Sequence, residues 1–223
     1  MSDGKVWLSK FLADWIDAFF KGVQKDEENF VEILRELSQI EIPGKDLVYI
    51  KKVWTESDSY ESLKQNLFLA LDIIENCDKD CENYLNKMFK ILFRYLNPIK
   101  LKSEENVLKN CGVMCASGHA LNIFQKAKTE TKSLQSFIDN LNKKFKINNM
   151  YTLIDENHII AKYPKCYCPL VNAGFVKDSS LCNCSTEWLH YNLTSVLERD
   201  IEIIRNGTFL EGKDECEFLI EMK

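Results

Sequence analysis

Two cysteine pairs are the residues of this chain best suited to chemistry. Each has the form Cys-x-Cys, and thirteen residues separate Cys166 and Cys168 from Cys182 and Cys184. In an extended segment, side chains at i and i+2 point to the same side, so each pair offers two sulfurs together. Zinc takes four ligands in a tetrahedron, with sulfur about 2.3 Å from the metal. We therefore predict a zinc ion bound by these four cysteines.

A second group of potential ligands lies upstream, at a spacing of four residues. If one helix runs through this segment, Cys111, Cys115 and His119 share one of its faces. Gly112 and Gly118 are small enough for a ligand or another backbone to approach closely. Cys111 and Cys115 are either additional metal ligands or core residues. With six sulfurs, an iron–sulfur centre becomes the alternative to zinc. His119 is expected to be a satisfied or exposed histidine rather than a ligand.

The cysteine count indicates the redox compartment. The chain has nine cysteines, an odd number, and no export signal, which is not the pattern of a secreted disulfide framework. We therefore expect a cytoplasmic protein with reduced thiols. Cys77, Cys81 and Cys216 are expected in the core, because a cysteine often behaves as a small apolar residue.

A reactive thiol is the alternative to a metal site. A nucleophilic cysteine needs a nearby base or a helix N-terminus to lower its pKa. His119 and His190 are candidate bases, and Cys184 directly precedes a helix expected from Ser185. The protein would then be a hydrolase or a redox enzyme. A structural module that binds another protein through its helical part is a third hypothesis, so the sequence leaves enzymatic activity undecided.

The charge and hydropathy of the sequence argue against two classes of partner, nucleic acids and membranes. The formal net charge is −5, and the basic residues are scattered among acidic ones. Nucleic-acid binding needs a basic patch, so we predict none. The apolar residues near the N-terminus follow helical spacing, and no segment reaches the roughly 20 apolar residues of a membrane span. We therefore predict no stable membrane association.

Hydrophobic periodicity predicts an α+β protein. The apolar residues follow a helical period up to about residue 146 and then alternate as in strands. We expect a helical region at 1–100 and a cysteine-rich α+β domain at 101–223, which either form separate cores or share one. In the second part we predict helices at 103–128, 133–144 and 185–197, and strands at 151–154, 158–163, 166–171, 200–205 and 214–222.

The last predicted strand sets the type of sheet. Cys216, Phe218, Ile220 and Met222 alternate with polar residues, mostly glutamates, which indicates one buried and one solvated face. A sheet with one solvated face is typically antiparallel.

The C-terminal part resembles known families over residues 105–223. A cysteine pair precedes Pro-Leu-Val, Cys182-Asn-Cys184-Ser185 opens a helix containing Trp188, and the chain ends with Gly212-x3-Cys216-x-Phe-x-Ile. This order, with the Cys-Gly-x-x-Cys at 111–115, resembles an uncharacterised family of prokaryotic cysteine-rich proteins. It also looks distantly like the 4-vinyl reductase-type domain, a small-molecule-binding module. The amino-thiazoline carboxylate hydrolase-like group shares the ending, but its catalytic pattern is not evident here.

The resemblance implies an antiparallel sheet packed on helices around a ligand pocket, with cysteines nearby. We expect a small apolar or aromatic ligand in that pocket. Carried over residue by residue, the candidates are Cys111, Cys115, Cys166, Cys168, Cys182 and Cys184, with Cys216 as the cysteine of the terminal hairpin. The leading hypothesis is therefore a metal-bearing, small-molecule-binding or sensory protein.

Overall fold

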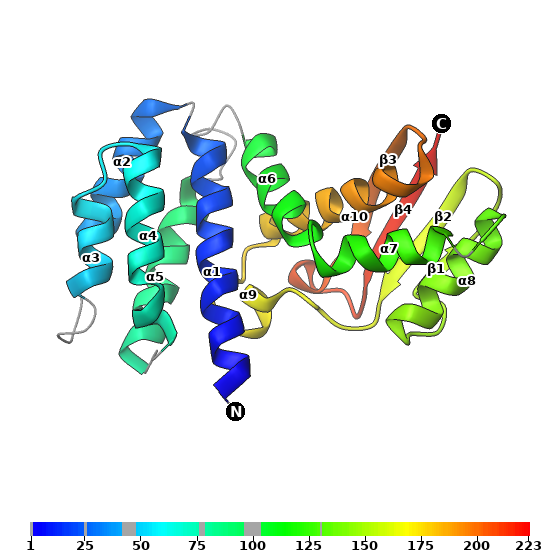
Figure 1. The fold of residues 1–223 in the computed structure, drawn as a ribbon, viewed down its shortest axis with the longest axis horizontal. Helices are drawn as coiled ribbons and strands as arrows, with labels where there is room; N and C mark the ends of the chain where they lie inside the picture. The colour runs from blue at the N-terminus through cyan, green and yellow to red at the C-terminus, as the bar shows by residue number, and fades with distance from the viewer. Residues whose placement is uncertain (1, 25, 42–47, 76–78, 96–103, 130) are drawn as a thin grey trace. The chain divides into compact units, whose positions relative to one another are not determined.

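The structure is a computed structural model in which helices precede a four-stranded antiparallel sheet (Figure 1). The predicted α+β class is thus confirmed. The described residues are 2–24, 26–41, 48–75, 79–95, 104–129 and 131–223, and the described side chains are those of 10–24, 26–41, 51–67, 83–95, 107–129 and 131–223. The predictions for Cys77 and Cys81 lie outside the described side chains.

The chain divides into two compact units. Unit 1 consists of residues 1–111 and 169–180, and unit 2 consists of residues 112–168 and 181–223. The chain therefore leaves unit 2 after Cys168 and returns to it at Leu181. Cys168 of the first predicted pair is the last residue before the chain enters unit 1, and Cys182 of the second pair follows Leu181, the first residue after its return.

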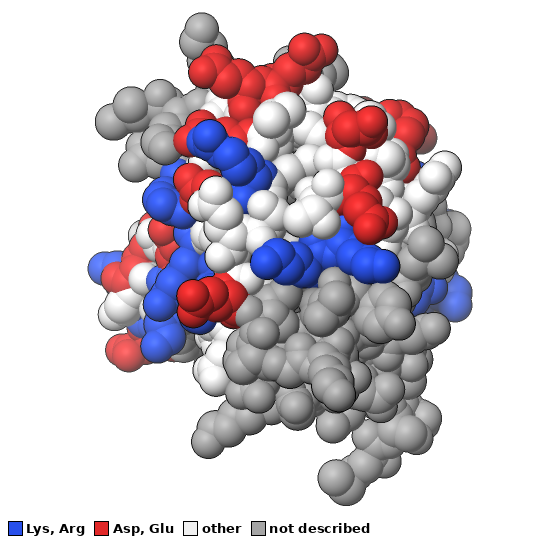
Figure 2. Space-filling view, turned by 90° about the vertical axis from the view of Figure 1, so that its left-hand side faces the viewer, with Lys and Arg blue, Asp and Glu red and all other residues white. Residues whose placement is uncertain are grey.

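Unit 1 is helical, as the 3.6-residue periodicity predicted. Its interior is rich in aromatic rings, with Trp15 packed against Phe19 and Phe89 at centroid distances of 5.7 and 5.6 Å. On the face drawn in Figure 2, described Lys and Arg residues lie among Asp and Glu residues. The helices are α1 (Ser2–Val23), α2 (Glu27–Ser38), α3 (Val48–Thr55), α4 (Tyr60–Glu75), α5 (Lys79–Tyr95), the first part of α6 (Glu104–Ala116) and α9 (Pro169–Asn172).

The segment 169–180 is anchored in unit 1 by buried apolar side chains. Leu170 is fully buried, and the ring of Phe175 stacks on Phe89 with centroids 5.8 Å apart. The strand predicted at 166–171 is wrong, because Pro169 begins the short helix α9. Proline suits the first helical position, where its missing N–H is not needed.

Unit 2 contains the sheet, with strand order β1-β2-β4-β3 and antiparallel pairing throughout. The hairpin and the antiparallel terminal strands are therefore confirmed. The elements of this unit are the end of α6, α7 (His119–Thr129), α8 (Leu134–Phe145), β1 (Tyr151–Leu153), β2 (His158–Tyr163), α10 (Cys182–Leu197), β3 (Ile201–Gly207) and β4 (Cys216–Met222), with short 3-10 turns at Ser179–Leu181 and Phe209–Glu211.

One face of the sheet forms the core of unit 2. Cys216, Phe218, Ile220 and Met222 of β4 are buried in a cluster with side chains of α7, α8 and α10, as the alternation predicted. The opposite face carries ion pairs such as Lys162 with Glu217, at 2.7 Å. Packing of these helices against one face of the sheet therefore determines which side chains of β4 are buried.

Two predicted helix boundaries are wrong. The helix expected at 103–128 breaks at Ser117 and Gly118, so α6 ends at Ala116 and His119 begins a new helix. Glycine disfavours a helix interior by roughly 1 kcal/mol relative to alanine, which explains the break. The helix expected from Ser185 begins three residues earlier, at Cys182.

Gly112 allows α6 to approach α10 closely. A Cβ atom at this position would lie 2.6 Å from the Cys184 carbonyl oxygen and 2.6 Å from Glu187 Cβ. The expected close approach of a backbone is therefore confirmed at Gly112. It is wrong at Gly118, where a Cβ would meet nothing within 4 Å.

Replacing Gly112 by alanine should destabilise unit 2. The added methyl group must push apart two helix backbones, and overpacking of this kind costs roughly 1–3 kcal/mol. Gly118→Ala is the matched control and should change the free energy of unfolding by less than about 1 kcal/mol. Urea unfolding followed by circular dichroism measures both. Equal effects of the two substitutions would contradict the close packing of α6 on α10.

Candidate functional site

Three thiols from separate segments lie at the end of the sheet where β4 begins. Cys216 is the first residue of β4 and pairs with Tyr163, the last residue of β2. Cys166 follows β2 in an irregular segment, and Cys182 is the first residue of α10. Cys166 interacts electrostatically with both Cys182 and Cys216. We call Cys166, Cys182 and Cys216 the thiol group.

A polar network surrounds the thiol of Cys182. Its Sγ donates to Thr208 Oγ1 at 3.2 Å, and the Thr208 hydroxyl donates to Glu211 Oε2 at 3.1 Å. Arg205 forms an ion pair with Glu211 at 3.1 Å and donates to Asn183 Oδ1 at 2.7 Å. This network connects the end of β3 to the first turn of α10, so it fixes the position of Cys182.

Burial raises the pKa of two thiols in this group. For Cys182, desolvation is the largest cause, and the Thr208 hydroxyl and the Arg205 charge oppose it. For Cys216, desolvation also raises the pKa, and a hydrogen bond from the Phe209 backbone N–H opposes it. Both thiols are therefore protonated near neutral pH.

The two sulfurs of the second cysteine pair do not point together. Cys182 and Cys184 both lie inside α10, where residues two apart are rotated by about 200° around the axis. The assumption that this pair is extended is therefore wrong. Within the described part of the chain, no three His, Cys, Asp or Glu side chains are arranged to hold a metal ion. Neither a four-thiolate shell of Cys166, Cys168, Cys182 and Cys184 nor a three-thiolate shell of the thiol group is preassembled.

The upstream candidates are divided between the two units. Cys111 belongs to unit 1, is fully buried, and directs its Sγ to the Trp15 carbonyl oxygen at 3.9 Å. Cys115 belongs to unit 2 and is half-buried. His119 is exposed at the start of α7, so it does not continue their helical stripe. The environment of Cys111 favours the core alternative for that residue.

The seven cysteines whose side chains are described form no disulfide bond among themselves. Cys184 is buried in the first turn of α10, rather than directly before the helix as expected. His190 is half-buried in the same helix.

A groove of about 580 Å³ lies in unit 2 at the opposite end of the sheet. It is bounded by the ends of α7, α10 and β4, the start of α8 and the turn between β1 and β2. Its apolar lining consists of Leu134, Leu153, Ile154, Leu197 and Met222. Volumes of roughly 300–1,000 Å³ are typical of small-molecule sites.

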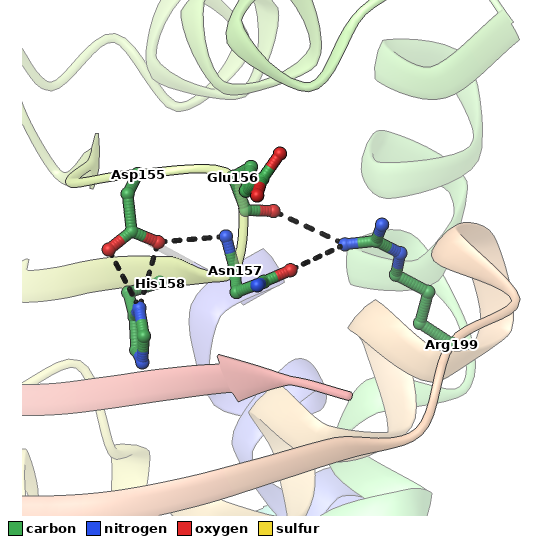
Figure 3. Close-up of polar contacts among 5 residues, drawn as sticks. All are labelled: Asp155, Glu156, Asn157, His158 and Arg199. Carbon is green, nitrogen blue, oxygen red and sulfur yellow. Dashed lines mark hydrogen bonds and ion pairs between the residues drawn. The ribbon is translucent and has the colours of Figure 1, made fainter.

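A hydrogen-bonded turn forms one wall of the groove (Figure 3). Asp155 accepts from the Asn157 backbone N–H at 2.8 Å and contacts His158 Nδ1 at 2.8 and 2.9 Å. These hydrogen bonds lower the pKa of Asp155, and the largest contribution comes from the bond with the Asn157 backbone N–H. Arg199 donates to the Glu156 carbonyl oxygen at 3.2 Å and to Asn157 Oδ1 at 3.5 Å, which ties the end of α10 to the turn.

Comparison with known proteins gives no relative. No protein-family model, curated protein or solved structure matches the chain. None of the described helices is both long and apolar enough to cross a membrane. The candidate sites therefore have to be judged on their own geometry.

The thiols should differ in reactivity. Iodoacetamide attacks thiolates, so the buried and protonated Cys182 and Cys216 should react at least about tenfold more slowly at neutral pH than the half-buried Cys166. Mass spectrometry of the labelled peptides measures each rate. In urea the three rates should become similar. Rapid labelling of Cys182 in the folded protein would contradict its buried, protonated state.

The raised thiol pKa values also predict how stability depends on pH. The stabilising contribution is fully present below the ordinary thiol pKa of about 8.5, because both states are then protonated. As pH rises above that value, the unfolded chain loses these protons first, so the free energy of unfolding should fall. In Cys216→Ala, the decrease in the free energy of unfolding with rising pH should be smaller. Urea unfolding at several pH values, with a chelator present, tests it.

Proposed function

We propose that this protein binds a metal ion through the thiol group of unit 2, as a metal-bearing, small-molecule-binding or sensory protein. Zinc is the expected ion, and an iron–sulfur centre is the alternative. The proposal is supported by the position of Cys216 opposite Tyr163, three residues before Cys166, and by the electrostatic interaction of Cys166 and Cys182 with Cys216.

The donor chemistry supports a thiophilic metal. Cysteine sulfur is a preferred ligand of zinc and of iron–sulfur clusters, and three thiolates leave one coordination position for water or a substrate. The protein's own part is to bring the three sulfurs together. Cys166 lies in an irregular segment, so it can shift toward Cys182 and Cys216 at lower cost than a residue of a strand. Cys168 and Cys184 lie two residues from members of the group and remain candidate ligands, and Cys115 of the same unit is a further one.

Protonation sets a condition on binding. Because the pKa values of Cys182 and Cys216 are raised, a metal has to displace their protons. The same protonation makes these two thiols poor nucleophiles at neutral pH. The reactive-thiol enzyme is therefore the less well supported alternative for this end of the sheet.

The small-molecule part of the proposal concerns the groove. An apolar or aromatic ligand is expected between sheet and helices, and the apolar lining of the groove supports this. A cytoplasmic location with no nucleic-acid partner and no membrane association also belongs to the proposal. The net charge of −5, with Lys and Arg among Asp and Glu on the face drawn in Figure 2, supports the absence of a nucleic-acid partner.

Elemental analysis of the protein, purified under reducing conditions without added metal, is the test. We expect about one zinc ion per chain, and we expect Cys166→Ser and Cys182→Ser to lose it. Cys216→Ser separates the two ligand sets: loss of metal supports the thiol group, and retention supports the pairs predicted from spacing. Circular dichroism of each variant shows whether it still folds.

Cys111→Ala is the matched control from unit 1. It should retain the metal, because Cys111 contacts the Trp15 carbonyl in the other unit. Loss of metal with an intact fold would bring the Cys111–Cys115 segment into the site and favour an iron–sulfur centre. If neither stoichiometric metal nor binding of added zinc or cobalt is found, the proposal is overturned.

A further inference from the structure

The groove at the end of unit 2 combines an apolar wall with a group of cations. Its apolar lining includes Ile154, which is 58% exposed although it is a large aliphatic residue. Three basic side chains also line the groove: Lys128 from the last turn of α7, Lys132 from the following connection, and Arg199 from the segment after α10. An apolar surface next to several cations is the complement of an amphipathic anion.

The three cations are not neutralised within the described part of the protein. None of them forms an ion pair with a described carboxylate. Arg199 donates to the Glu156 carbonyl and the Asn157 side-chain oxygen, which are both uncharged acceptors. Its guanidinium is thereby oriented by neutral acceptors rather than by a carboxylate. Lys128 and Lys132 are exposed.

The acidic residues of the groove do not cancel this charge locally. Asp155 is held by His158 Nδ1 and by the Asn157 N–H, on its own side of the turn (Figure 3). Glu156 is exposed, and its backbone oxygen rather than its carboxylate meets Arg199. An anion in the groove would therefore face Lys128, Lys132 and Arg199 without displacing an internal ion pair.

The start of α8 adds to the positive potential. Ser133 caps this 12-residue helix, its side chain accepts from the Ser136 N–H, and Ser133 and Gln135 line the groove. The N-terminal end of a helix carries a partial positive charge, which favours anions. This effect acts in the same direction as the three side-chain charges.

We propose that the groove binds a small amphipathic carboxylic acid, with its carboxylate among Lys128, Lys132 and Arg199 and its hydrocarbon body against Ile154, Leu197 and Met222. This inference deepens the small-molecule part of the proposed function and is independent of the metal. All of the lining residues belong to unit 2.

Octanoate is a suitable probe, and 1-octanol is its uncharged counterpart of equal length. In 1H–15N NMR titrations, octanoate should shift the amide signals of the groove and bind at least about fivefold more tightly than 1-octanol. Arg199→Gln should weaken octanoate binding by roughly tenfold, since hydrogen bonds to charged groups contribute about this much. Ile154→Ser should weaken octanoate binding but leave the preference over 1-octanol unchanged.

Lys143→Gln is the matched control, because Lys143 is an exposed lysine at the other end of α8. It removes one positive charge from unit 2 at a position that does not line the groove, and it should leave binding unchanged. If Lys143→Gln and Arg199→Gln weaken octanoate binding equally, net charge alone would explain the weakening, and the proposal would be overturned. Equal affinity for 1-octanol and octanoate would also overturn the proposal, as would the absence of amide-signal shifts up to about 10 mM probe. Metal content plays no part in this readout, so failure here would leave the thiol proposal intact.

Discussion

Strand β4 is the element on which both candidate sites depend. It pairs along its length with β2 on one side and β3 on the other, so it has no freedom to slip. A slip of one residue would turn every inward side chain outward. Its first residue, Cys216, belongs to the thiol group, and its last residue, Met222, lines the groove. The two sites are thus about 20 Å apart along one strand, at opposite ends of the same buried face.

The second constraint is the segment 169–180, which leaves unit 2 and packs into unit 1. The burial of Leu170 and the stacking of Phe175 on Phe89 hold this segment in unit 1. Cys168 is the last residue before this excursion, and Leu181, directly before Cys182, is the first after it. The connection between the two cysteine pairs is therefore a packed part of unit 1 rather than a free loop.

Much of the fold could be predicted because it depends on local periodicity. The alternation of Cys216 to Met222 correctly indicated an antiparallel sheet with one buried face. The start of α10 could not be predicted in the same way: its N-cap is Leu181, which makes no side-chain capping bond, so no capping residue marks the start of the helix at Cys182. That error mattered, because it turned a helical Cys-x-Cys into an assumed extended one. The groove was beyond sequence reasoning, since its walls come from five elements joined only in the folded chain.

Electrostatics explains why the thiol group is compatible with a metal although Cys182 and Cys216 are protonated without one. Three thiolates would place three further negative charges close to Glu211, whose charge is balanced by its ion pair with Arg205. Burial is the largest cause of the raised pKa values of Cys182 and Cys216, and nearby negative groups add to it, so both thiols keep their protons. A divalent cation would supply positive charge and would therefore favour the loss of the thiol protons. The Arg205–Glu211 pair, fixed by Asn183 and Thr208, would then remain as a neutral wall beside Cys182 in both states.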